Sequence, residues 1–226
     1  MMKHNLKVCS VLLLTGLLLL ALVACGQSAA ESGVTTTAGS SEETSHETKE
    51  PEAAQAEIEA GPGFRHAEIE VENYGTIKLE LDGNTAPITV ENFVALAQSG
   101  FYDGLTFHRI MDGFMIQGGD PTHIGTGGSG TRIKGEFLAN GVENNISHVK
   151  GVISMARATA YDSASSQFFI MVADYTGLDG MYAAFGHVTE GIEIVEQIAK
   201  DARPIDNNGT IPYEEQPVIT RISITD

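Results

Sequence analysis

The chain has few cysteines, few basic residues and no tryptophan, and each shortage narrows its possible functions. Its two cysteines, Cys9 and Cys25, both lie in the first 25 of 226 residues, which excludes a disulfide or a cysteine-based metal site in the rest of the chain. Only 13 Lys and Arg stand against 30 Asp and Glu, and a net charge of −17 argues against binding to nucleic acid. The hydrophobic content of 42% is ordinary for a globular protein and argues against disorder over the whole length.

The first 24 residues have the pattern of a secretory signal peptide. Two lysines, Lys3 and Lys7, precede an apolar run over 8–24 that is too short and too interrupted for a comfortable membrane span. The run ends in Leu-Val-Ala-Cys-Gly at 22–26, which resembles a bacterial lipobox. We therefore expect cleavage before Cys25, lipidation of Cys25 and anchoring at the extracytoplasmic side of a bacterial cell membrane. The alternatives are a plain signal peptide or an uncleaved anchor.

The next segment, residues 25–62, is predicted to be a disordered acidic tether rich in Ser, Thr and Glu. Between 26 and 62 it has eight Glu, one Lys and no aromatic residue, so it cannot bury enough apolar surface to offset the entropy of ordering. Residues 63–226 are then long enough for one domain with a well-buried core.

Within this domain, alternating and apolar runs predict many short strands and two helices. The helices are expected from Pro87 to about Gly100 and over 192–200, and a long surface loop is expected over 205–215. This pattern favours an antiparallel barrel or sandwich over a parallel sheet, which needs a helix between most strands. The expected strands are 67–71, 76–81, 106–111, 114–117, 151–156, 167–172, 183–188 and 217–225.

Common catalytic motifs are poorly represented in the domain. The cluster Gly125–Gly130 matches G-x-G-x-x-G, but the residues after it read as strand or loop, which favours a structural turn over a dinucleotide site. No serine occupies a nucleophile elbow, and the five histidines are scattered without metal-ligand spacing. We therefore predict no metal site.

The segment Phe107–Asp120, FHRIMDGFMIQGGD, has two interpretations on spacing alone. Arg109 fits an edge residue in a salt bridge, with Phe114 and Met115 as ordinary core residues. The same residues, together with Gln117, fit an apolar pocket with polar lips.

The order of several motifs resembles the cyclophilin family of peptidyl-prolyl isomerases. FHRIMDGFMIQGGD is followed by GTGG, SMARA, SQFFI, LDG and FG, and the resemblance spans essentially all of residues 66–226. It implies a mainly β fold, an eight-stranded antiparallel β-barrel capped by two α-helices. It also implies catalysis of X–Pro rotation, a reaction that requires no cofactor or metal.

Carried over by position, the resemblance makes Arg109 the catalytic residue. Three positions depart from the frequent family pattern: Gly177 stands in place of Trp, Tyr182 in place of His and Arg157 in place of Asn. The implied substrate-binding residues are Phe114, Met115, Gln117, Gly125, Ala156, Arg157, Ala158, Gln167, Phe169, Leu178 and Tyr182.

We therefore expect an isomerase that acts on proline-containing, unfolded or partly folded secreted polypeptides. We further expect a monomer that is attached to the membrane by its N-terminal lipid and does not bind nucleic acid. The alternatives are a tethered receptor for proline peptides with little turnover and, less well matched in length, a solute-binding lipoprotein.

Overall fold

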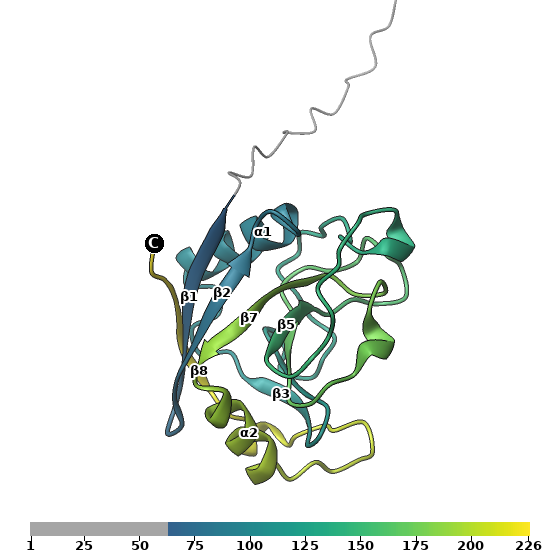
Figure 1. Ribbon diagram of the computed structural model, residues 1–226. Helices are drawn as coiled ribbons and strands as arrows, with labels where there is room; N and C mark the ends of the chain where they lie inside the picture. Colours follow the sequence, from purple (N-terminus) through teal and green to yellow (C-terminus); the bar gives the residue numbers. More distant parts are fainter. Residues whose placement is uncertain (1–62) are drawn as a thin grey trace, which may run out of the picture. The chain divides into compact units, whose positions relative to one another are not determined.

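The computed structural model describes residues 63–226, which form a curled antiparallel sheet with helices α1 and α2 at opposite ends (Figure 1). The predicted signal peptide and tether lie outside these residues. Over 63–226, no helix is both long and apolar enough to cross a membrane, and no three His, Asp or Glu side chains are grouped to hold a metal ion. The elements are β1 (Phe64–Val71), β2 (Gly75–Asp82), α1 (Pro87–Gln98), β3 (Phe107–Met111), β4 (Met115–Gly118), η1 (Leu138–Asn140), β5 (Val152–Met155), β6 (Phe168–Met171), η2 (Thr176–Leu178), β7 (Ala184–Glu190), α2 (Ile192–Asp201), η3 (Tyr213–Glu215) and β8 (Ile219–Ile224).

The eight strands run in the order β3-β4-β6-β5-β7-β2-β1-β8, and every pairing is antiparallel. The two outer strands meet through backbone hydrogen bonds: the N–H of Phe107 donates to the carbonyl of Pro217 (3.0 Å), and the N–H of Ile219 donates to that of Leu105 (2.7 Å). These bonds close the sheet and satisfy backbone groups that an open edge would expose.

Alternation along β1 and β2 places one face of the hairpin in the core. Ile69, Ile77 and Leu81 are fully buried, whereas the charged residues between them face outward. The turn uses Asn73 and Gly75 with positive φ angles of 64° and 118°, a region that glycine and asparagine enter readily. Sequence alternation therefore fixes both the strands and their inward face.

Helix α1 begins at Pro87 and packs its apolar side, including Phe93, on the sheet. Its first N–H groups have no local side-chain cap. Instead the buried carboxylate of Glu136 accepts the N–H groups of Ile88 (3.1 Å) and Thr89 (2.8 Å). A carboxylate at a helix N-terminus satisfies otherwise unpaired donors and complements the helix dipole.

Two hydrophobic clusters fill the domain. The larger one centres on Phe93, whose ring lies 5.3 Å from Tyr102, 5.5 Å from Phe168 and 5.3 Å from Phe185 between centroids. The smaller cluster includes Phe169 and lies on the other side of β6. Alternate side chains of β6 therefore enter the two clusters. Because the strand is buried on both faces, all of its residues are apolar.

The predicted fold class is confirmed, as are the eight strands and both helices, with ends that differ by a few residues. Residues 205–215 form a surface loop, as expected, and contain the short helix η3, but part of the loop also pairs with β3. The N–H of Ile110 in β3 donates to the carbonyl of Gly209 (2.8 Å), and the N–H of Ile211 donates to that of His108 (3.0 Å). Because these β3 groups would otherwise be unpaired, the loop folds onto the strand and buries Ile211.

Candidate active site

The hairpin of β3 and β4 places Arg109 directly opposite Gln117 in the antiparallel register. The register shifts between Phe107 and Arg109, so His108 is the extra residue of a β-bulge. A bulge changes the direction in which the next side chain points. His108 itself is buried, and neither of its ring nitrogens has a hydrogen-bond partner among the described residues. Burial lowers the pKa of His108.

The guanidinium of Arg109 is held from two sides. Its Nε donates to the carbonyl of Asn208 (2.7 Å), and its Nη1 donates to Oε1 of Gln117 (3.1 Å). The other contacts are to thioether sulfur, at 3.7 Å from Nη1 to Met115 and 3.3 Å from Nη2 to Met111. Since a guanidinium has five N–H groups and sulfur is a weak acceptor, Arg109 keeps donors that a substrate can take.

Arg109 is half-buried and lacks an ion pair with any residue of 63–226, so the salt-bridged interpretation is not supported. Burial lowers its pKa, while Tyr182 and Asp206 oppose that effect. An arginine nevertheless stays charged at any working pH. The site therefore presents a fixed positive charge with unused donors.

Beside Arg109 lies a pocket of about 240 Å³ with an apolar floor. Met115 and Phe169 are buried, and Phe114 and Leu178 are partly exposed, so the cavity is open at its rim. Such a cavity suits a small apolar ring. The lining consists of Arg109, Phe114, Met115, Gln117, Ala156, Arg157, Phe169, Leu178 and Tyr182.

A second, larger pocket of about 420 Å³ adjoins the first. The two share Gln117, Ala156 and Arg157, and a side-chain relay connects them: Gln117 Nε2 donates to Gln167 Oε1 (2.9 Å), and Gln167 Nε2 donates to the carbonyl of Gly127 (2.8 Å). The second pocket is lined by Gln117, Gly125, Thr126, Gly127, Gly128, Gly130, Arg132, Ala156, Arg157, Ala158, Ser163, Ser165 and Gln167.

The glycine-rich loop forms one wall of this second pocket and is fastened from below by Asp120. The buried carboxylate accepts the N–H of Gly125 (2.6 Å) and the N–H and hydroxyl of Thr122. Burial alone would raise the pKa of Asp120, but these hydrogen bonds outweigh it and lower the pKa. A side chain at Gly127 would collide with this carboxylate. Residues 131–137, directly after the loop, form no helix, which agrees with the expected structural turn.

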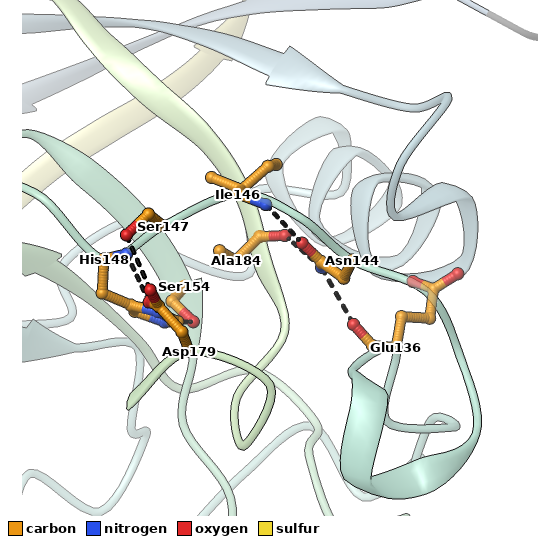
Figure 2. A network of polar contacts seen from close by, with 8 residues as sticks. All are labelled: Glu136, Asn144, Ile146, Ser147, His148, Ser154, Asp179 and Ala184. Carbon is orange, nitrogen blue, oxygen red and sulfur yellow. Dashed lines mark hydrogen bonds and ion pairs between the residues drawn. The ribbon is translucent and has the colours of Figure 1, made fainter. Parts of the chain in front are cut away.

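A polar network supports the floor of the first pocket (Figure 2). Nδ1 of the buried His148 lies 2.9 Å from Asp179 Oδ1, and Nε2 lies 3.0 Å from Ser154 Oγ. A carboxylate can only accept, so Nδ1 carries the proton and the neutral ring accepts the hydroxyl of Ser154. Burial lowers the pKa of His148 more than Asp179 raises it. The ring stacks on Phe169 with 6.0 Å between centroids, and Asp179 follows Leu178, so the network positions two pocket residues.

The segment before β5 is fixed by a second group of contacts in the same view (Figure 2). Asn144 Nδ2 donates to the carbonyls of Glu136 (2.9 Å) and Ala184 (2.8 Å), and Asn144 Oδ1 accepts the N–H of Ile146 (3.2 Å). Asn144 therefore joins β7 to the segment that carries His148.

The three departures from the family pattern have structural counterparts. Tyr175 packs on Phe114 with 5.2 Å between ring centroids, and a Cβ at Gly177 would lie 3.1 Å from the Tyr175 ring. The guanidinium carbon of Arg157 lies 4.7 Å from the centroid of Tyr182. Tyr175 thus packs beside both Gly177 and the pocket residue Phe114, and Arg157 and Tyr182 form one stacked wall.

All twelve predicted catalytic and substrate-binding residues lie in these two adjoining pockets, nine of them in the first and Gly125, Ala158 and Gln167 in the second, whereas the predicted lipidation site, Cys25, lies outside the described residues. Sequence reasoning missed Asn208 and Arg132. Asn208 acts through its backbone carbonyl, 99 positions from Arg109, and no sequence pattern could reveal that contact. Arg132 follows the glycine cluster, and a basic residue at that place in an acidic chain could have indicated a binding residue.

Comparison with known proteins identifies the family. Residues 66–224 match the family model described as cyclophilin type peptidyl-prolyl cis-trans isomerase/CLD. A peptidyl-prolyl cis-trans isomerase of Helicobacter pylori is 47% identical over 128 residues, 56% of this chain and 76% of that protein. Peptidyl-prolyl cis-trans isomerase A of Dickeya dadantii is 40% identical over 152 residues, 63% of this chain and 74% of that protein.

Solved structures give the same result. A cyclophilin type peptidyl-prolyl cis-trans isomerase of Cryptosporidium parvum is 32% identical, with a TM-score of 0.64, and the match covers 73% of this chain and 99% of that chain. The same protein in the presence of the dipeptide Ala-Pro gives a TM-score of 0.62 at 32% identity, covering 71% and 99% of the two chains.

Proposed function

The chain belongs to the cyclophilin-type peptidyl-prolyl cis-trans isomerase family and is a peptidyl-prolyl isomerase, and we propose that it assists the folding of secreted polypeptides at the outer face of a bacterial cell membrane. The observation that carries the reaction is the combination of an apolar pocket with a half-buried arginine at its rim. The lipobox-like residues 22–26 support the location.

The reaction needs a lower barrier to rotation and no new bond. Rotation about a peptide C–N bond requires loss of resonance, with a barrier of about 18–20 kcal/mol. For X–Pro the two isomers differ by only about 1 kcal/mol, so both are available as substrate and product. A site that binds the twisted imide more tightly than either planar form accelerates both directions.

In this proposal the proline ring enters the smaller pocket against Met115 and Phe169, which excludes water from one side of the bond. As the bond twists, the imide nitrogen loses resonance and gains a lone pair. An N–H of Arg109 then donates to that nitrogen, while Asn208 and Gln117 keep the guanidinium in place. Arg109 therefore stabilises the twisted form selectively, with no proton transfer.

The proposed setting follows from the N-terminal sequence. A lipid on Cys25 would attach the chain to the membrane, and residues 26–62 would connect the anchor to the isomerase domain. Newly exported chains emerge unfolded on that side, and their X–Pro bonds isomerise slowly without a catalyst. We propose that the anchored protein works there as a monomer.

The test uses the full-length chain in detergent and a reporter protein whose refolding is limited by an X–Pro bond. The slow refolding phase should accelerate in proportion to the concentration of the chain. Binding of the reporter without acceleration would instead favour a proline-peptide receptor. The location is tested separately by protease treatment of spheroplasts or protoplasts, in which the outer face of the cell membrane is accessible. Loss of the domain indicates an outward-facing protein, and full protection contradicts the proposed location.

A further inference from the structure

The larger of the two pockets carries positive charge in a strongly negative domain. Residues 63–226 contain 10 Lys and Arg against 22 Asp and Glu. The lining of the 420 Å³ pocket nevertheless includes Arg132 and Arg157 and no Asp or Glu. Its other side chains are small or neutral and polar. Two arginines in one cavity favour a carboxylate as ligand, because the planar guanidinium matches carboxylate geometry.

The carboxylates near this pocket are committed to other partners. Asp120 lies under the glycine-rich loop and accepts the N–H of Gly125. Asp162 accepts the N–H of Gly135 (2.9 Å). Over residues 63–226, neither pocket arginine has an Asp or Glu oxygen within 4.0 Å. The positive charge of the pocket is therefore not cancelled by a neighbouring ion pair.

The two arginines contribute in different ways. Arg157 makes four hydrogen bonds to the carbonyls of Met181, Ala158 and Thr159 and stacks on aromatic rings, so its charge is fixed in the wall with few donors to spare. Arg132 is exposed, and within 63–226 its side chain makes no hydrogen bond. Arg132 therefore keeps its guanidinium free to bind an incoming carboxylate.

We propose that this pocket binds an acidic side chain on the N-terminal side of the X–Pro bond, so that the isomerase prefers such peptides. The proposal rests on the proposed function. Ala156 and Arg157 line both pockets, so a peptide whose proline occupies the smaller pocket can extend along these residues into the larger one. In this proposal the part of the peptide before the X–Pro bond follows that path into the larger pocket. The net charge of the domain would disfavour acidic peptides, so a preference for them would arise from this pocket.

The experiment compares isomerisation of short peptides by NMR exchange, with the full-length chain in detergent. The host peptides have one X–Pro bond. Each peptide carries Glu, or the uncharged isostere Gln, at one of the three positions before X. We expect kcat/KM to be about three- to ten-fold higher for Glu than for Gln at one of these positions, as for partly exposed charge pairs. The ratio should approach one at 1 M salt, where the Debye length is about 3 Å.

Variants assign the effect to the pocket. In Arg132→Gln the Glu-to-Gln ratio should fall toward one, and the ratio taken within each variant corrects for any general loss of activity. Arg221→Gln, an exposed arginine on β8, removes the same charge outside the pocket and should leave the ratio unchanged. A ratio of one or below at all three positions, or an unchanged ratio in Arg132→Gln, would overturn the proposal. Absence of catalysis on the Gln peptides would instead contradict the proposed function.

Discussion

Replacing Arg109 by alanine tests the proposed mechanism most directly. The variant removes the donor that is assigned to the twisted imide while the apolar floor of the pocket remains. Loss of one preorganised transition-state donor costs a factor of about 10²–10³ in rate, or about 2.7–4 kcal/mol at 1.36 kcal/mol per tenfold. We expect that loss in kcat/KM, measured by NMR exchange on an X–Pro peptide.

The structural cost of the same change is much smaller. Arg109→Ala deprives the carbonyl of Asn208 and Oε1 of Gln117 of one donor each, but the site is half-exposed and water can replace them. A net loss of about 1 kcal/mol follows, which lowers Tm by about 2–4 °C for a domain of this size. Arg221→Ala is the matched control and should keep both properties. If Arg109→Ala retains more than about half of kcat/KM, Arg109 is a structural residue and the mechanism is wrong.

Three further predictions concern the anchor, the pH dependence and the pocket rim. Cys25→Ser should abolish metabolic labelling with fatty acid and membrane fractionation; unchanged labelling would refute lipidation. Burial lowers the pKa of His108 and His148 below 6.5, so the unfolded state binds protons more readily, and Tm should be level above about pH 6.5 and fall as the pH drops below it. In His148→Gln the fall in Tm should be smaller, and an equal fall would exclude His148 as its source. The kcat/KM of the unmodified chain should stay flat from about pH 6 to 8, because no residue is assigned a proton transfer. Cyclosporin, the cyclic peptide inhibitor of the family, should bind weakly because Gly177 lacks the indole of the frequent Trp, a loss of roughly 2–4 kcal/mol in binding free energy. In titration calorimetry, Gly177→Trp should restore affinity only when Tyr175 is also replaced by alanine. Nanomolar binding to the unmodified chain would contradict the prediction of weak binding.

Local sequence patterns predicted most of the fold because its strands and helices have local causes. Alternation marked β1 and β2, and Pro87 marked the start of α1. The contacts between distant segments had no such signal. Glu136 caps α1 from 47 positions away, and the loop that carries Gly209 pairs with β3 because that strand needs partners, which no spacing in the loop itself indicates.

The site was predictable to the extent that one hairpin builds it. The register of β3 and β4 sets Arg109 opposite Gln117, so both lie in a single recognisable motif. Spacing alone could not choose between a salt bridge and a pocket, because that choice depends on Phe169 and Leu178, which arrive from β6 and η2. The family resemblance supplied what local patterns lacked.

The position of β1 has a mechanical consequence for an anchored protein. This first strand of the described domain lies inside the sheet, paired with β2 from Phe64 to Val71 on one side and with β8 from Ala67 to Val71 on the other. Antiparallel hydrogen bonds run perpendicular to the strands, so tension along β1 loads both ladders in shear and does not peel them open one bond at a time. A lipid at Cys25 would pull on this strand whenever a bound client is drawn away from the membrane. Such an anchor would tether the domain through a strand that is paired on both sides, and the domain would then resist unfolding while it holds a polypeptide under load.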